Sequence, residues 1–394
     1  MKCRVCESKK TTEVVNLGKQ PLANKYPKNK NEIKNEKKFF LKVHFCVKCK
    51  SGQIKKIINR NLMFEDYYYL SSVNKNLKDH FVKLSKKLRK YKFVVDIGSN
   101  DGILLEPLKK LNIKAVGIDA SKNVGKIANK KGFKTYVGFF GKYIINKIIK
   151  DHSKPDLIIA SSVITHLENP KKFAKEIKYF LTKNGDLIVE IEYLHNFIKN
   201  LEFERFYFDR PFYFSANSIN ILFKNVGMTL FDIEHVDIHG GSLRCYIKNS
   251  EKFKVTKRCK KILSDENKRL SINSLKKFNK QINLQSKIFK SNLTHLKNKN
   301  NLIIGYGAPA RVATITNVAN INSDLISYII DDSPLKQNRF SPGKHIKILP
   351  KTKNINKEIK IVIVFAYEYF NEIRKSFKKY NIKFFKPIPF RRLK

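Results

Sequence analysis

Long apolar runs are missing from the 394-residue chain, although 42% of its residues are hydrophobic. A membrane-spanning helix needs about eighteen or more consecutive apolar residues, so we expect no membrane partner. The first residues, from Met1 to Cys6, lead directly into polar, cysteine-bearing sequence and form no apolar signal region. These absences predict a soluble, cytoplasmic protein. The length exceeds that of one ordinary domain, and the apolar fraction can fill buried cores.

Acidic side chains are scarce: 33 Asp and Glu stand against 81 Lys and Arg, which gives a net charge of +48. An excess of this size is typical of proteins that bind nucleic acids or anionic lipids. Long blocks of like charge are also absent, and the lysines accompany many Asn and Ile, which adenine- and thymine-rich codons favour. We therefore interpret the charge mainly as compositional and expect no nucleic-acid partner, while RNA binding stays an alternative.

The sequence has no internal repeat of fixed period and divides into units at 1–78, 79–250 and 251–394. The first unit has little helical periodicity. The second alternates short apolar runs with helical patterns, and the third has the same alternation after a long helical stretch to about 299. Buried strands separated by helices predict an α/β fold with a doubly wound sheet. The expected strands are Phe93–Ile97, Ala115–Ile118, Leu157–Ala160, Leu187–Ile191, Leu302–Gly305, Leu325–Ile330, Ile361–Phe365 and Lys383–Phe385, and the expected helices of the second unit are 79–90, 103–111, 121–131 and 170–182.

Four of the six cysteines form two Cys-x-x-Cys pairs in the first unit. A cytosolic setting argues against disulfides, and zinc favours tetrahedral sites to which each such turn supplies two sulfurs. Four thiolates would close the coordination shell, so we predict structural zinc. Unmetallated or redox-active dithiols are the alternative. The predicted ligands are Cys3, Cys6, Cys46 and Cys49.

A glycine-containing loop follows the first strand of the second unit, in Asp96-Ile-Gly98-Ser-Asn100-Asp-Gly102. The glycines permit a tight turn, but the loop lacks the Gly-x-Gly-x-x-Gly pattern that cradles a pyrophosphate. An acid at the strand end suits a ligand with an ammonium group, and Asp119, which ends the next strand, suits ribose hydroxyls. Together these features favour S-adenosylmethionine over a dinucleotide. The predicted cofactor-binding residues are Asp96, Gly98, Asn100, Gly102, Asp119 and Ser161.

Polar residues also follow later strands, where the carboxyl edge of a sheet binds ligands. His166 comes just after the third strand and can act as general acid, general base or substrate ligand. An aromatic and charged stretch at 203–215 follows the fourth strand. His239 and Arg244 flank a Gly-Gly turn, for which a plain turn and a binding role are both open.

The third unit contains its own glycine loop, Gly305-Tyr-Gly-Ala-Pro-Ala310, and Asp331 ends the strand that follows. This matches a dinucleotide fingerprint, and Arg311 and Lys336 nearby would suit phosphates. The loop keeps an NAD-dependent oxidoreductase open as an alternative.

Three blocks of motifs occur in order along nearly the whole chain. The first has the four cysteines, Asn16 to Asn24 and Tyr67 to Ser72; the second has the cofactor loop, His166, the Tyr207 segment and His239-Gly-Gly-Ser-Leu-Arg244; the third has Gly305-Tyr-Gly-Ala, Asp331 to Gln337 and Pro342 to Ile346. In these blocks the chain resembles the sugar C-methyltransferases that act on nucleotide-linked deoxysugars.

This resemblance implies a class I methyltransferase sheet, an N-terminal zinc-binding domain and a second Rossmann-like domain that closes over a nucleotide sugar. It implies S-adenosylmethionine as cofactor, zinc as a structural metal and a nucleotide sugar as substrate. The implied catalytic residues are His166, Tyr207, Asp209 and Arg210, and the implied substrate-binding residues are His239, Arg244, Arg311, Asn317 and Lys336.

The chain departs from the family at the expected base. Family members read Tyr-His-Glu-His where this chain reads Tyr207-Phe208-Asp209-Arg210. A guanidinium stays protonated and cannot remove a proton next to a ketone, although it can stabilise an enolate. His166 or Asp209 would then serve as base, or the methyl acceptor would be oxygen or nitrogen. C-methylation is the first expectation and O- or N-methylation the alternative, with an RNA methyltransferase, an NAD-dependent oxidoreductase or an inactive binding protein as rivals.

Overall fold

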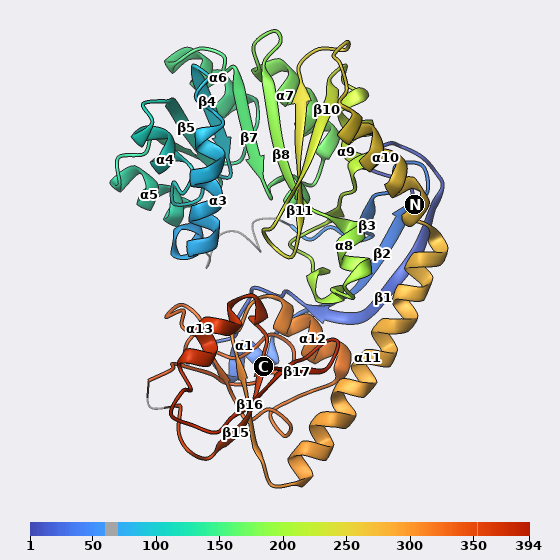
Figure 1. Cartoon of the computed structure of the whole chain (residues 1–394), viewed down its shortest axis with the longest axis vertical. Coiled ribbons are helices and arrows are strands. Elements are labelled where there is room, and N and C mark those ends of the chain that lie inside the picture. The colour runs from blue at the N-terminus through green and yellow to red at the C-terminus, as the bar shows by residue number, and fades with distance from the viewer. Residues whose placement is uncertain (60–69, 353) are drawn as a thin grey trace.

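The computed structural model describes residues 1–59, 70–352 and 354–394, and the aromatic stretch Tyr67–Tyr69 lies outside these residues. Three β-sheets organise the described part of the chain. Figure 1 shows the central sheet and its helices in the upper part, the C-terminal sheet in the lower part and the N-terminal strands between them. No helix among the described residues is long and apolar enough to cross a membrane.

The central sheet has the strand order β10-β11-β8-β7-β4-β5-β6. Strands β4 to β8 are parallel, and β11 and β10 are added antiparallel at one edge. The order reverses between β4 and β7, so the carboxyl ends of these strands border the crevice in which such sheets bind ligands. The predicted doubly wound sheet is confirmed. Its strands are β4 (Phe93–Ile97), β5 (Lys114–Asp119), β6 (Thr135–Val137), β7 (Leu157–Ser161), β8 (Asp186–Glu192), β10 (Thr229–Val236) and β11 (Ser242–Lys248).

Helices cover both faces of this sheet. Successive strand residues point to opposite faces, so Val95 and Ile97 join one apolar core while Val94 joins another. The helix expected at 79–90 begins earlier, at Lys75, because the Asn74 side chain accepts a hydrogen bond from the Leu77 amide and caps it. The helices are α3 (Lys75–Lys86), α4 (Leu105–Lys110), α5 (Lys122–Lys130), α6 (Lys142–Asp151), α7 (Pro170–Phe180), α8 (Leu194–Lys199) and α9 (Ala216–Lys224), with short 3-10 turns η1 (Ser71–Val73), η2 (Ile164–His166) and η3 (Phe203–Arg205).

The N-terminal unit forms a small antiparallel sheet in the order β1-β2-β3-β9. Its last strand comes from the central part of the sequence, because Gly52 pairs with Tyr213 and Gln53 with Phe212. The N-terminal unit is therefore joined to the central unit by backbone pairing. Its elements are β1 (Thr11–Pro21), α1 (Lys30–Lys34), β2 (Lys38–Cys46), β3 (Gly52–Ile54) and β9 (Phe212–Tyr213).

The C-terminal sheet has the order β14-β13-β12-β15-β16-β17, and all neighbours but β16 and β17 are parallel. The strand expected at Leu325–Ile330 is shorter than predicted, since only Ile329–Ile330 pair in the ladder. The elements are β12 (Leu302–Tyr306), α12 (Arg311–Ala319), β13 (Ile329–Ile330), β14 (Ile348–Leu349), β15 (Ile359–Val364), η4 (Tyr367–Tyr369), α13 (Phe370–Lys375), β16 (Lys383–Lys386) and β17 (Arg391–Leu393).

The long helical stretch expected to about 299 is two helices, α10 (Lys257–Arg269) and α11 (Ile272–Asn298). The break lies at Ser271, whose side chain accepts from the Ser274 amide while the Ser274 hydroxyl accepts from the Ser271 amide. This reciprocal capping box starts a new helix. Helix α10 packs against α9 and β10, whereas α11 packs against β1 and α12. The boundary at residue 250 stays a prediction.

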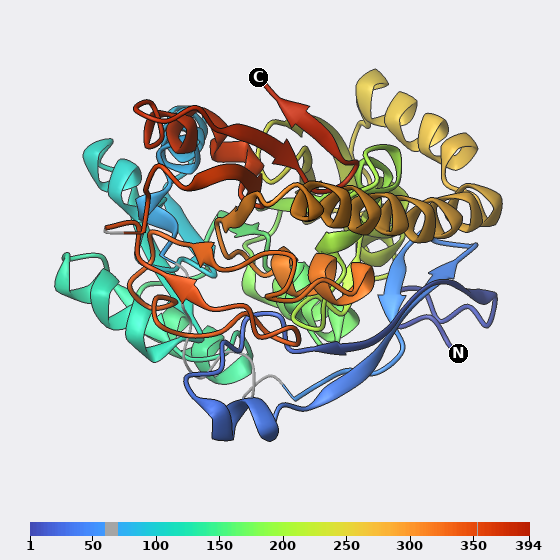
Figure 2. The same ribbon diagram turned by 90° about the horizontal axis from the view of Figure 1, so that it is seen from below.

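One apolar core joins all three units. It contains Val43 and Phe45 of the N-terminal sheet, Phe206 of the central unit, and Ile315 and Phe365 of the C-terminal unit. Figure 2, viewed from below, shows the N-terminal strands and α11 running alongside the C-terminal unit. The N-terminal sheet therefore positions the other two units around the crevice.

Candidate active site and zinc centre

The four predicted zinc ligands meet in one buried cluster. The sulfur of Cys3 lies 3.6 Å from that of Cys49, and the sulfur of Cys6 lies 3.6 Å from that of Cys46. All four sulfurs lie within 4.8 Å of one another. A tetrahedron with zinc–sulfur bonds of about 2.3 Å has edges of roughly 3.8 Å, so the cluster fits zinc. Four thiolates leave no open position, which makes the metal structural.

The two knuckles have the same backbone form. The residue after each Cys-x-x-Cys, Glu7 or Lys50, has a positive φ, and its amide donates to the carbonyl of the first cysteine of the pair. The local sequence therefore preorganises each pair of thiols, and the antiparallel pairing of β1 with β2 brings the pairs together.

The predicted cofactor loop turns sharply after β4. Gly98 and Gly102 have φ of 76° and 87°, and a Cβ at Gly98 would lie 2.3 Å from Val163. These positions therefore require glycine. The Asp119 carboxylate accepts from the amides of Asn100 and Ser121, both at 2.8 Å. It thereby ties the loop to the end of β5, as a ribose-binding acid is placed in such folds.

Buried carboxyl groups collect beside this loop. Burial, and then the charges of Asp119 and Glu190, raise the pKa of Asp96 well above its usual range. A cationic ligand would relieve this repulsion. S-adenosylmethionine carries an ammonium and a sulfonium, so the residues fit this cofactor. Ser161, also predicted here, donates to Glu190 at 2.8 Å.

His166 and the Tyr207 segment come together at the same edge of the sheet. The His166 Nδ1 lies 2.6 Å from the backbone carbonyl oxygen of Asp209, so it carries the proton and the basic lone pair is on Nε2. Burial, and then the positive charge of Arg210, lower the pKa of His166 to about 4. The Arg210 guanidinium lies 5.0 Å from the Tyr207 ring centroid. Burial raises the pKa of Tyr207 to about 12, so this phenol stays protonated.

Two residues at this site were given no role by the sequence reasoning. Glu192, the last residue of β8, binds both Arg210 and Arg205. Burial opposes its ionisation, but these two arginines hold its pKa at about 2. Asn24 of the N-terminal unit donates to the Asp209 carboxylate at 2.7 Å. A charged side chain on a buried strand needs a partner, so Glu192 did carry a signal; Asn24 did not.

His239 begins the turn before β11 with a φ of 51°. Burial lowers its pKa, although Glu192 acts in the opposite direction. The charges of Glu192 and Arg210 both act on His239, and its role in binding substrate stays a prediction.

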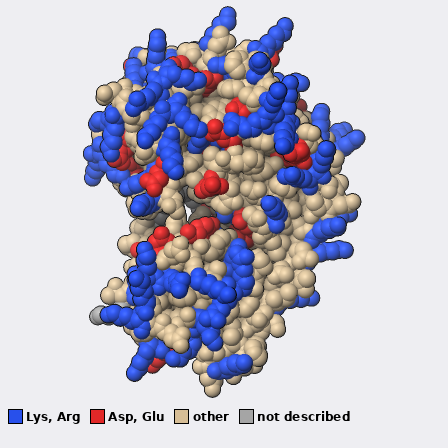
Figure 3. All heavy atoms as spheres, in the orientation of Figure 1, with Lys and Arg blue, Asp and Glu red and all other residues tan. Residues whose placement is uncertain are grey.

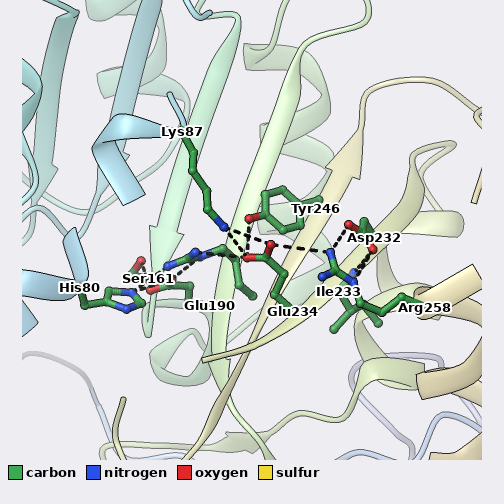
Figure 4. A network of polar contacts seen from close by, with 10 residues as sticks. His80, Lys87, Ser161, Glu190, Asp232, Ile233, Glu234, Tyr246 and Arg258 are labelled. Carbon is green, nitrogen blue, oxygen red and sulfur yellow. Dashed lines mark hydrogen bonds and ion pairs between the residues drawn. The ribbon is translucent and has the colours of Figure 1, made fainter. Parts of the chain in front are cut away.

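Arg244 lies in another network, in which its guanidinium contacts His80 and Glu234. Figure 4 labels these two partners. Its guanidinium donates to Glu190 at 2.7 Å and to Glu234 at 3.4 Å, and it lies 3.0 Å from the His80 ring nitrogen. These contacts fix Glu190, whose charge acts on Asp96 of the cofactor loop. A role of Arg244 in binding substrate stays a prediction.

The remaining predicted substrate residues lie in the C-terminal unit. Arg311 pairs with Glu368 at 2.8 Å, and its Nη1 is buried with no hydrogen-bond partner among the described residues. Asn317 donates to the carbonyls of Ala313 and Pro342. Lys336 lies 3.8 Å from Asp331. Arg311 and Asn317 lie on α12 and Lys336 follows β13, so all three belong to the C-terminal unit.

The glycine loop of the C-terminal unit is contacted by the N-terminal unit. The Tyr26 hydroxyl donates to the Ala308 carbonyl at 2.7 Å, and Tyr26 is buried. Asp331 accepts from the Ala308 amide at 2.6 Å, as Asp119 does for the first loop. The two loops are therefore built alike, but the second is covered by protein.

Comparisons with known proteins agree with this geometry. Residues 69–233 match a family model described as "Methyltransferase domain", residues 237–389 match "C-methyltransferase C-terminal domain", and residues 3–64 match "Putative zinc binding domain". The chain is 24% identical over 399 residues to the C-methyltransferase NovU of Streptomyces niveus, covering 98% of this chain and 95% of that protein.

Two further similarities cover less than half of the chain. A ubiquinone biosynthesis O-methyltransferase of Pelagibacter ubique is 32% identical over 113 residues, which is 29% of this chain and 47% of that protein. The solved magnesium protoporphyrin IX methyltransferase of Synechocystis PCC 6803 is 15% identical, with a TM-score of 0.37 over 46% of this chain and 91% of that one.

The sheet, the cofactor loop and these family matches identify the chain as an S-adenosylmethionine-dependent methyltransferase with a structural zinc centre. The C-terminal family model and the full-length relative further support a place in a C-methyltransferase family.

Proposed function

We propose that the enzyme methylates a carbon next to the ketone of a nucleotide-linked deoxysugar. The observation that carries this proposal is the orientation of His166, whose Nδ1 hydrogen bond to the Asp209 carbonyl leaves the basic lone pair on Nε2, while the charge of the next residue, Arg210, acts on the same imidazole. A neutral imidazole can accept the proton, and a fixed guanidinium can stabilise the enolate that forms. Because its lowered pKa makes His166 a weak base, the guanidinium must supply much of the stabilisation. The base and the stabilising charge reside on different residues.

His166 removes the proton from the carbon, and Arg210 stabilises the negative charge that develops on the ketone oxygen. Glu192 and the Tyr207 ring hold the guanidinium in place. The Asp96–Gly102 loop and Asp119 would hold S-adenosylmethionine, whose sulfonium would supply the methyl group. Transfer leaves one proton on His166, which it returns to solvent.

A nucleotide sugar suits the opposite wall of the crevice. Arg311, on the C-terminal unit, has a buried N–H that finds no partner in the described part of the chain and can meet an anionic diphosphate. The resemblance in three blocks, from the zinc knuckles to the Pro342–Ile346 segment, supports the same substrate class.

The proposal is tested with a panel of nucleotide-linked keto sugars and their reduced forms, each incubated with S-adenosylmethionine. We expect the keto sugars to gain the mass of one methyl group, with a new carbon–methyl signal by NMR. Methylation of the reduced forms alone would contradict C-methylation and favour O- or N-methylation, which the loss of the usual second histidine keeps as the second candidate.

The pH dependence gives a separate prediction. A base with a pKa lowered to about 4 stays neutral through most of the acidic range, so kcat/KM is expected to remain level from pH 8 to about 5 and to fall only toward pH 4. Removing the Arg210 charge raises the His166 pKa. As the pH is lowered, the residual activity of Arg210→Gln should therefore begin to fall at a higher pH than the activity of the wild type does. Zinc content is followed at each pH as the control. A wild-type limb near pH 6.5 would contradict His166 as this base.

Two rival functions have less support. Figure 3 shows Lys and Arg over much of one face, but acidic side chains gather around the hollow between the upper and lower parts, which disfavours RNA in the crevice. The C-terminal glycine loop, which would hold NAD, is contacted by Tyr26. Retention on RNA without competition from sugar nucleotides, or thermal stabilisation by NAD alone, would reverse this ranking.

A further inference from the structure

A chain of ion pairs runs from the candidate active site into the C-terminal unit. Arg210 and Arg205 both donate to the same oxygen of Glu192, Arg205 through its Nη1 at 3.4 Å. Arg205 continues to Glu368 at 3.2 Å, and Glu368 binds Arg311 at 2.8 Å. Positive and negative charges therefore alternate across the boundary between the two units.

This chain is removed from solvent over most of its length. The side-chain exposures are 3% for Glu192, 6% for Arg205, 14% for Arg210 and 28% for Glu368. Exposed ion pairs contribute little, but in a buried chain the loss of one partner leaves a charge uncompensated. Each member therefore affects the position of the next.

The shared oxygen makes Glu192 the point of competition. Arg205 divides its N–H groups among Glu192, Glu202 at 2.7 Å and Glu368. When Glu368 is in place, one N–H group of the Arg205 guanidinium binds Glu368 and is not available to Glu192. When Glu368 moves away, Arg205 contacts only Glu192 and Glu202 of the central unit. It then competes more strongly with Arg210 for the Glu192 oxygen.

Arg210 directly follows Asp209, whose carbonyl accepts from His166 Nδ1, and the Arg210 charge lowers the pKa of that imidazole. A shift of the Arg210 guanidinium therefore reaches the reacting groups directly. Tyr367, next to Glu368, also donates to Glu204 at 2.8 Å, so the same turn, η4, is attached to the central unit at a second point.

We propose that Glu192, Arg205 and Glu368 are positioning residues that make the catalytic placement of Arg210 depend on the seating of the C-terminal unit. The catalytic role of Arg210 in this inference rests on the proposed function, whereas the coupling between Glu368 and Arg210 does not. It gives the C-terminal unit a part in the chemical step in addition to substrate binding.

The test compares Glu368→Gln with Glu368→Asp, which keeps the charge, and with Glu372→Gln, an exposed carboxylate of neighbouring α13 outside the chain of ion pairs. In the full-length, zinc-loaded enzyme we expect Glu368→Gln to lower kcat about fivefold or more. The affinity for S-adenosylmethionine should stay within about twofold, because its loop lies on β4 and β5. Glu368→Asp should recover part of kcat, and Glu372→Gln should match wild type.

A second readout needs no substrate. The Arg210 Nε–H resonance, assigned by its loss in Arg210→Lys, is expected to move in Glu368→Gln and to stay in place in Glu372→Gln. If the Arg210 resonance does not move in Glu368→Gln, the inference is overturned. It is also overturned if Glu368→Gln changes only KM, because Glu368 would then act through Arg311 alone. A moved resonance without methylation of any sugar nucleotide would uphold the coupling and defeat the proposed function.

Discussion

Replacing His166 with glutamine is expected to lower kcat for methyl transfer by about 10²–10⁴-fold. The amide cannot take a proton, although it keeps much of the size and polarity of the imidazole. In the wild type, His166 contacts the Asp209 carbonyl and is affected by the charge of Arg210, and both residues lie at this edge of the sheet. The affinity for S-adenosylmethionine, measured by calorimetry, should therefore change little, because the Asp96–Gly102 loop and Asp119 are untouched.

The matched control is His152→Gln. His152 contacts Tyr136 at the end of α6, away from the crevice, and burial lowers its pKa as well. This variant should retain activity within about twofold, since a substitution away from the site has little effect on the free energies of groups in the site. Full activity of His166→Gln would remove His166 as the base and transfer that role to Asp209, whose pKa is raised by burial.

Removing zinc is expected to abolish most of the activity and to lower the melting temperature. The metal binding energy of such a site is folding energy, and the N-terminal sheet shares one apolar core with the other two units. Asn24, which holds the Asp209 carboxylate, and Tyr26, which binds the C-terminal loop, both belong to this unit. We expect at least about a tenfold loss of activity in Cys46→Ser or after chelation.

Metal content, melting temperature and activity are measured on the same samples. Cys259→Ser serves as the control because Cys259 is also buried but lies in α10, outside the cluster. It should keep its zinc. Restoring the metal to chelated protein should restore activity; a metal-free protein with unchanged melting temperature and activity would contradict a structural role.

The cofactor loop illustrates what sequence reasoning reaches. Gly98, Gly102 and Asp119 lie within one strand-turn-helix-strand segment, so their spacing alone fixes the turn and the acid that accepts its amides. The zinc ligands are similar, because each Cys-x-x-Cys pair is a local turn. The break between α10 and α11 was missed even though Ser271 and Ser274 carried a capping signal, since apolar spacing continued across it.

The crevice illustrates what such reasoning does not reach. Glu192, Arg205 and Glu368 lie on β8, η3 and η4, and no spacing in the chain indicates that they form one series of ion pairs. Asn24 reaches Asp209 across 185 positions. These partners are selected by how the three units pack.

The sequence by itself determined the zinc knuckles, the cofactor loop and the class of sheet, because each depends on residues that are close along the chain and on backbone rules that act locally. The tertiary structure alone decided which carboxylate holds Arg210, which carbonyl orients His166 and which tyrosine covers the second glycine loop. Buried charges and buried N–H groups must find partners wherever the folded chain brings them, and those partners come from distant segments.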